Sequence, residues 1–200
     1  MSDDIFSKKI FKHQKDNNVI SSLKRFGLLV FETVKVILIS LAIILPIRYF
    51  LVQPFIVEGA SMQPTFESNE YLIIDELTYR FDRPQRGQVV VFRYQRDPRQ
   101  FFIKRIVGLP GDTIEMKNGK VYINDKLLEE NYVEADNMSD TNMSRIILGE
   151  NEFFLMGDNR SNSLDSRVFG PVDKKYIIGR VWFRTWPFDR FSFFTSPQYK

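Results

Sequence analysis

The chain has 200 residues, 44% of them hydrophobic and 14% aromatic, which is typical of a folded protein with one packed domain. It contains no cysteine and a single histidine, His13, which excludes a disulfide framework, a zinc–thiolate site, a cysteine nucleophile and a two-histidine zinc motif. The net charge of +3 lies entirely within residues 1–25, which argues against a nucleic-acid-binding body. We expect no metal or cofactor.

Residues 1–25 are polar and rich in lysine, and we expect a cytoplasmic basic arm there. Residues 26–47 form a largely apolar segment, which as a helix is about 33 Å long and matches a bilayer core of about 30 Å. Glu32 and Lys35 interrupt it one turn apart, where they can pair or snorkel. Because the basic flank precedes the segment, we predict one transmembrane helix that leaves residues 48–200 outside the cytoplasm.

Two other interpretations of residues 26–47 are a cleaved signal peptide and a buried core helix. The long charged region and the lack of a small-x-small site directly after the apolar run argue against a signal peptide. Residues 48–57 combine aromatic residues with Pro54 and are expected to lie at the membrane interface and lead into a strand.

Beyond residue 65 the pattern predicts short strands and no long amphipathic helix, so the soluble domain should be mainly β. Asn118-Gly119 predicts a type I′ hairpin turn, because both residues tolerate positive φ. Residues 96–98 are expected to form a loop, and residues 129–145 a surface loop or an irregular hairpin. The expected strands cover residues 71–75, 89–94, 101–107, 113–116, 121–123, 152–156 and 182–184.

The C-terminal region is rich in aromatic residues. We interpret them as core, with an apolar surface that rests on a membrane as the alternative. They are Trp182, Phe183, Trp186, Phe188, Phe191, Phe193 and Phe194.

Ser61, within residues 59–65, is the candidate nucleophile. A serine needs a base to take its proton, and without a suitable histidine that base must be a lysine or a carboxylate. Lys104 fits, because Phe102 and Ile106 share its face of the predicted strand and burial among apolar groups lowers a lysine pKa. An exposed strand lysine is the alternative.

Residues 157–167 are dense in charges and hydroxyl groups. A calcium loop is disfavoured, because Arg160 stands where such a loop needs an oxygen ligand and the closing glutamate is missing. A polar surface turn and a network that supports a site both fit this composition.

Three segments, in this order after the apolar segment, resemble the signature boxes of bacterial type I signal peptidases of the compact Gram-positive form. They are Ser61–Thr65, Lys104–Asp112 and Gly157–Arg167, and the resemblance covers roughly residues 30–185. It implies a membrane-anchored serine endopeptidase that removes signal peptides from exported pre-proteins after small residues at −1 and −3. The implied mechanism is a Ser-Lys dyad that forms an acyl-enzyme.

The same resemblance implies a single-pass protein of the cell membrane, with its catalytic domain on the outer face. Its implied partners are the signal peptides of exported pre-proteins and the lipid bilayer, with the secretion machinery nearby. Nucleic acid is not among them.

By position, the resemblance makes Ser61 the nucleophile and Lys104 the general base, then the acid to the leaving amine. Ser163 is expected to orient the Lys104 amine through a hydrogen bond. Gly157 is expected to allow close packing near Lys104. Supporting ion pairs are expected from Asp165 with Arg167, near Arg105.

The oxyanion hole is expected to use the backbone N–H of Ser61. Some family members add a serine hydroxyl two residues earlier, where this chain has Gly59, so the backbone at Gly59 is the candidate second donor. An extended peptide that adds to a strand edge, over shallow pockets, is the expected mode of substrate binding. The candidate substrate-binding residues are Phe55, Ile56, Val57 and Met62.

Two other functions fit part of the sequence. A self-cleaving repressor-type peptidase also uses serine and lysine, but the apolar segment and the lack of a DNA-binding N-terminal domain argue against it. A non-catalytic membrane-anchored β-protein that binds export partners would be expected to lack the serine or the lysine, and this chain has both.

Overall fold

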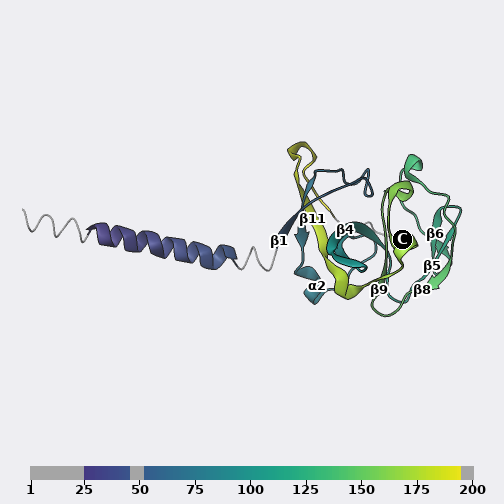
Figure 1. Ribbon diagram of the computed structural model, residues 1–200, viewed down its shortest axis with the longest axis horizontal. Helices are drawn as coiled ribbons and strands as arrows, with labels where there is room; N and C mark the ends of the chain where they lie inside the picture. The colour runs from purple at the N-terminus through teal and green to yellow at the C-terminus, as the bar shows by residue number, and fades with distance from the viewer. Residues whose placement is uncertain (1–24, 46–51, 195–200) are drawn as a thin grey trace, which may run out of the picture. The chain divides into compact units, whose positions relative to one another are not determined.

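The computed structural model describes residues 25–45 and 52–194, and the chain divides into two units, residues 1–48 and 49–200 (Figure 1). The first unit contains a helix of 21 residues, Arg25–Leu45, which is fully exposed. It is long and apolar enough to cross a membrane. Within it, Lys35 Nζ lies 4.0 Å from Glu32 Oε2, one turn apart, as their spacing predicted. Except for Arg25, the predicted basic arm lies outside the described residues.

The second unit is mainly β, as expected. Within the described residues its larger sheet has the strand order β1–β2–β11–β3–β4–β9–β10, and β12 pairs with β11. All of these pairs are antiparallel. The strands are β1 Val52–Ile56, β2 Tyr71–Asp75, β3 Val89–Tyr94, β4 Asp97–Gly108, β9 Glu152–Met156, β10 Val172–Asp173, β11 Ile177–Trp186 and β12 Ser192–Phe193.

A smaller antiparallel sheet has the order β7–β6–β5–β8. Its strands are β5 Thr113–Lys117, β6 Lys120–Ile123, β7 Lys126–Leu127 and β8 Met143–Ile147. The helices of this unit are single turns: α2 Thr78–Phe81, α3 Ser166–Phe169 and the 3₁₀ turns η1 Ala135–Asn137, η2 Arg160–Asn162, η3 Lys174–Tyr176 and η4 Phe188–Arg190.

Strand β3 lies inside the sheet and has hydrophobic clusters on both faces. Its side chains alternate, so Val89 and Val91 enter one cluster while Val90 and Phe92 enter another. This explains why β3 is a continuous apolar run rather than an alternating pattern.

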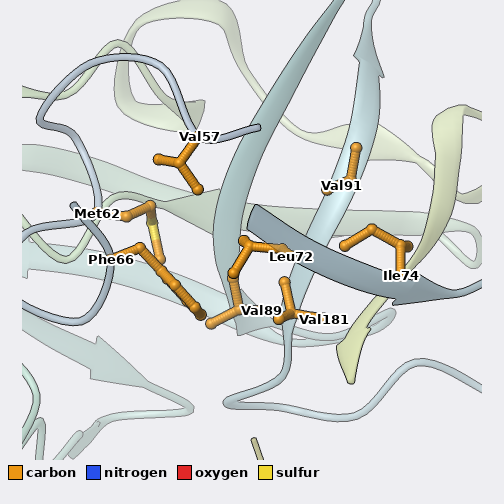
Figure 2. Packing of buried hydrophobic residues seen from close by; sticks show 8 residues of the cluster. All are labelled: Val57, Met62, Phe66, Leu72, Ile74, Val89, Val91 and Val181. Atoms are coloured by element: carbon orange, nitrogen blue, oxygen red, sulfur yellow. The ribbon is translucent and has the colours of Figure 1, made fainter. Parts of the chain in front are cut away.

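The first cluster anchors the turn that carries Ser61. Met62 and Phe66 of this turn are buried in it, and Figure 2 shows them beside Leu72 and Val89. The backbone of the turn closes through Phe66 N, which donates to the Met62 carbonyl at 2.9 Å. Ser61 itself is only partly buried.

Several predicted strands are confirmed at their bounds, among them residues 71–75, 89–94 and 152–156. The type I′ hairpin is also present, with φ of 50° at Asn118 and 74° at Gly119. Local pattern suffices for these elements, because a buried apolar run or a turn dipeptide specifies each of them.

The two predicted loops are partly wrong. Asp97 and Pro98 begin β4, because the pairing register shifts after Arg93 and leaves Pro98 opposite no partner, so its missing N–H breaks no ladder bond. Residues 143–147 form β8, which pairs with β5, a contact that a local pattern does not reveal.

The interpretation of the C-terminal aromatic residues as core is wrong for most of them. Phe194 is partly buried and packs on the first cluster. Five of the seven are exposed large hydrophobic side chains, two of them on β11 and three in the segment that follows it. These are Trp182, Trp186, Phe188, Phe191 and Phe193.

Candidate active site

Ser61 and Lys104 lie in direct contact. Ser61 is on the turn after β1, Lys104 is on β4, and Lys104 Nζ lies 2.7 Å from Ser61 Oγ. The amine also donates a hydrogen bond of 2.8 Å to the Ile103 carbonyl, which fixes its direction. The fold therefore places a nucleophile within proton-transfer distance of a possible base.

Lys104 is 4% exposed, and its strand pairs with β3 on one side and β9 on the other. Burial lowers its pKa to about 8, against the opposing charges of Asp165 and Asp158, which raise it. A lysine with this pKa is about half neutral at pH 8, so it can accept a proton from a hydroxyl group.

Arg105, the next residue on β4, is buried and pairs with Asp158. Its Nε and Nη2 donate to the two carboxylate oxygens of Asp158 at 2.8 and 2.6 Å. Thr65 Oγ1 donates to the same carboxylate at 2.5 Å, and the Tyr132 ring covers the guanidinium at 4.0 Å. This pair joins the three segments singled out in the sequence, although Asp158 was not among the predicted site residues.

Asp165 and Arg167 form a second pair, with Arg167 Nε and Nη2 both at 2.8 Å from the carboxylate. The Gly157 N–H donates to Asp165 Oδ2 at 3.0 Å. Burial raises the Asp165 pKa, but the hydrogen bond and charge of Arg167 outweigh it and the net shift is downward. Arg105 is bonded to Asp158 instead, so the expected network consists of two separate pairs.

Ser163 Oγ is buried and makes no hydrogen bond with the described residues, so the expected bond to Lys104 is not formed in this structure. The hydroxyl lies near Asp165 and helps to lower its pKa. A Cβ at Gly157 would lie 2.6 Å from Ser163 Cβ and 2.5 Å from the Ser61 carbonyl oxygen. Because Gly157 has no side chain, Ser61 and Ser163 can both lie close to its backbone.

A family model described as "Signal peptidase, peptidase S26" matches residues 30–186. The chain belongs to this signal peptidase family. Signal peptidase I of Leptolyngbya laminosa is 38% identical over 80% of this chain and 81% of the relative. Signal peptidase I P of Bacillus subtilis subsp. natto is 36% identical over 80% of this chain and 91% of its own length.

A signal peptidase I of Enterococcus faecalis with a solved structure is 30% identical and matches 50% of this chain and 97% of its own, with a TM-score of 0.42. The family match confirms the resemblance inferred from the three segments. It also makes this chain a serine peptidase, and thus a hydrolase.

In this signal peptidase family member, a groove of about 460 Å³ lies beside the Ser61–Lys104 contact. Phe55, Ile56 and Val57, three of the four candidate substrate-binding residues, line it. Sequence reasoning missed the rest of the lining, which comes from the segment after β1, from β2, β3 and β4, and from the end of η2 and the residues after it. These missed residues are Glu58, Ala60, Leu72, Val91, Phe101, Phe102, Ile103, Asn162 and Leu164.

Met62 does not line this groove. Its side chain is 1% exposed and packs in the first hydrophobic cluster (Figure 2). We therefore assign Met62 to the core instead of to the substrate-binding residues, because Met62 and Phe66 are the two residues of the turn whose side chains are buried.

The two predicted oxyanion donors differ. No atom of the described residues accepts a hydrogen bond from the Ser61 N–H, which leaves this donor available. The Gly59 N–H donates to Ser68 Oγ at 3.3 Å, so it is already engaged. Gly59 has a φ of 88°, a conformation that favours glycine.

No group of three or more histidine, aspartate or glutamate side chains in the described part of the chain is placed to hold a metal ion.

Proposed function

We propose that this protein removes the signal peptides of exported pre-proteins by a Ser61–Lys104 dyad and an acyl-enzyme. The observation that carries the proposal is the 2.7 Å contact between Ser61 Oγ and the Nζ of a buried lysine whose pKa is lowered to about 8. A non-catalytic binding protein has no need to bury a lysine against a serine, since burial disfavours its charged form.

In the acylation step, Ser61 Oγ attacks the scissile carbonyl carbon while neutral Lys104 Nζ takes its proton. The Ser61 N–H donates to the oxyanion that develops on the carbonyl oxygen. The resulting ammonium of Lys104 then gives its proton to the leaving nitrogen, which becomes the new N-terminus of the mature protein.

In the deacylation step, Lys104 is neutral again and takes a proton from a water molecule that attacks the ester carbonyl. The C–O bond to Ser61 breaks, Ser61 Oγ regains a proton from Lys104, and the signal peptide leaves with a free carboxylate. One base thus serves both half-reactions.

The groove suits an extended peptide. Strand β1 is the outermost strand of its sheet, and β4 pairs with β9 only from Arg105 onward, so both present unpaired backbone groups beside the groove. A peptide that adds to these edges has alternate side chains directed into the groove, which agrees with selection at −1 and −3. The rings of Phe55 and Phe101, 5.6 Å apart, limit the size of side chain that fits near them.

We further propose that the helix Arg25–Leu45 spans the cell membrane with its N-terminus in the cytoplasm. Its length and composition support this assignment. Exposed tryptophan and phenylalanine side chains around β12 suit the membrane–water interface, where aromatic rings are favoured. Substrates delivered by the secretion machinery would then be cut at the outer face.

The test is incubation of the full chain in detergent with a pre-protein that carries an Ala-x-Ala site, and product masses are measured. Wild type should cut after the second alanine, and Ser61→Ala should not. Ser144→Ala, at an exposed serine of β8, is the matched control and should cut like wild type. Cleavage by purified Ser61→Ala, or none by wild type, would refute the proposal.

A further inference from the structure

A second cluster of buried charges contacts the nucleophile turn from the C-terminal part of the chain. Arg184 on β11 is 7% exposed and Glu70 is 2% exposed. Arg184 Nη1 donates to both carboxylate oxygens of Glu70, at 3.0 and 2.9 Å, and to the Thr65 carbonyl at 3.1 Å.

The remaining donors of Arg184 reach the segment that follows β11. Its Nε donates to the Arg190 carbonyl at 2.7 Å, and its Nη2 donates to Ser192 Oγ at 3.0 Å. One guanidinium therefore joins the nucleophile turn, the start of β2 and the C-terminal segment, which matches the planar, many-donor geometry of arginine.

Arg190 adds to the same cluster. Its Nη1 lies 2.7 Å from Glu67 and 2.9 Å from Glu70, and its Nη2 donates to the Pro64 carbonyl at 3.4 Å. Within the described residues, these two arginines are the donors to the Pro64 and Thr65 carbonyls, which are consecutive in the turn.

Thr65 is thereby held from two sides. Its carbonyl accepts from Arg184, while its hydroxyl donates to Asp158, the partner of Arg105. The next residue, Phe66, is buried, with its ring 4.5 Å from that of Phe194.

We propose that Arg184 is a positioning residue, which acts with Glu70 and Arg190 to fix the turn that aims Ser61 Oγ at Lys104 Nζ. This inference rests on the proposed function. Arg184 makes no contact with Ser61 or Lys104, so its effect must pass through the backbone of residues 61–65. Displacing a nucleophile by a fraction of an ångström lowers the rate of the chemical step more than it weakens substrate binding.

The test compares two double variants, each of which removes one ion pair that an arginine of β11 makes with a residue in or directly before β2. Arg184→Met with Glu70→Gln removes the cluster without leaving a buried charge unpaired. Arg180→Met with Asp75→Asn is the matched control, because this pair joins β11 and β2 at 3.0 Å and its side chains bond to Thr78 rather than to residues 61–65.

With the pre-protein substrate, we expect the Arg184 double variant to lose about tenfold or more in kcat with KM changed by less than about threefold. The midpoint of its pH profile should stay near 8, because the burial of Lys104 is unaltered. The control pair should keep the wild-type kcat. Arg184→Lys keeps the positive charge but not the planar set of guanidinium donors. It should therefore have a kcat between those of wild type and the Arg184 double variant.

A kcat near the wild-type value in the Arg184 double variant, or an equal loss in the control, would overturn the proposal. If the double variant does not fold, Arg190→Gln tests the proposal instead. Arg190 is partly exposed, so its loss should be tolerated, and it donates a hydrogen bond to the Pro64 carbonyl of the turn. Its kcat should fall with KM unchanged, and an unchanged kcat counts against the proposal. Failure of the proposed function itself is distinct, since wild type would then cut no pre-protein.

Discussion

The two sheets of the second unit differ in whether they bury ion pairs, although the larger sheet also has exposed pairs such as Arg99–Asp97. In the four-stranded sheet the ion pairs lie at the surface: Lys117 pairs with Glu115, and Arg145 contacts Asp125. In the eight-stranded sheet and the turns beside it, Arg105–Asp158, Arg167–Asp165 and Arg184–Glu70 are buried. Both regions have an apolar core, so the charges are not a consequence of a weak core.

The difference shows what the active site requires of the fold. Burying a charge is unfavourable unless it is paired and hydrogen-bonded, and apolar residues of similar volume often fill such a site at least as stably. Every buried pair named here has one partner in, or hydrogen-bonded to, one of the three segments that surround Ser61 and Lys104. We infer that they are kept for geometry and for the pKa of Lys104 and not for stability.

Lys104→Met should have the largest effect, and it should change activity and stability in opposite directions. Activity should fall by about a thousandfold or more, because the base is lost. Stability at pH 7 should rise, by up to about 3 kcal/mol, because wild type buries a lysine whose pKa is lowered from 10.5 to about 8. Chemical denaturation measures this gain.

The way in which this stability gain changes with pH provides a check. Between about pH 8 and 10.5 the unfolded chain holds a proton that the folded chain lacks, so wild-type stability rises with pH over this window. The gain in the free energy of unfolding from Lys104→Met should therefore be complete below pH 8 and shrink as pH rises toward 10.5. An advantage that grows over this range would contradict the assignment.

Asp158→Asn should destabilise the protein by about 3–5 kcal/mol, because it leaves Arg105 buried opposite a neutral amide. Urea denaturation measures the loss. Combining it with Arg105→Met should restore much of the stability but not the activity, since Thr65 would still lack its carboxylate partner. Recovery of activity in the double variant would show that the pair is only structural.

The pH dependence of wild-type cleavage is a smaller effect. With neutral Lys104 as the base, kcat/KM should rise about tenfold per pH unit below pH 8 and level off above it. Initial rates from pH 6 to 10 measure this curve. A curve that is flat across pH 8 would exclude Lys104 as the base.

Lys117→Ala tests the other sheet and should have the smallest effect. Lys117 and Glu115 form a surface ion pair, and water and salt screen its attraction. Neither the cleavage rate nor the free energy of unfolding should therefore change measurably. A large loss of activity would show that the four-stranded sheet contributes to the site more than its contacts indicate.

Local sequence was enough for the features that depend on neighbouring residues. The apolar run of residues 89–94, the Asn118-Gly119 turn and the apolar helix are all legible without a fold, because side-chain period and backbone preference act over a few residues. The three segments also identified the family and singled out Ser61 and Lys104, because they occur together, in the family's order and after an apolar segment.

Tertiary structure alone decided how these residues meet. The sequence left Lys104 either buried or exposed, and pairing of β4 with β3 and β9 decided this. It predicted Met62 as a substrate-binding residue, whereas the packing of the turn places it in the core. The Arg184–Glu70 pair joins residues 114 positions apart, which no local period or turn preference encodes. Such contacts form only when the folded sheet brings distant strands together, so their partners are set by the fold as a whole.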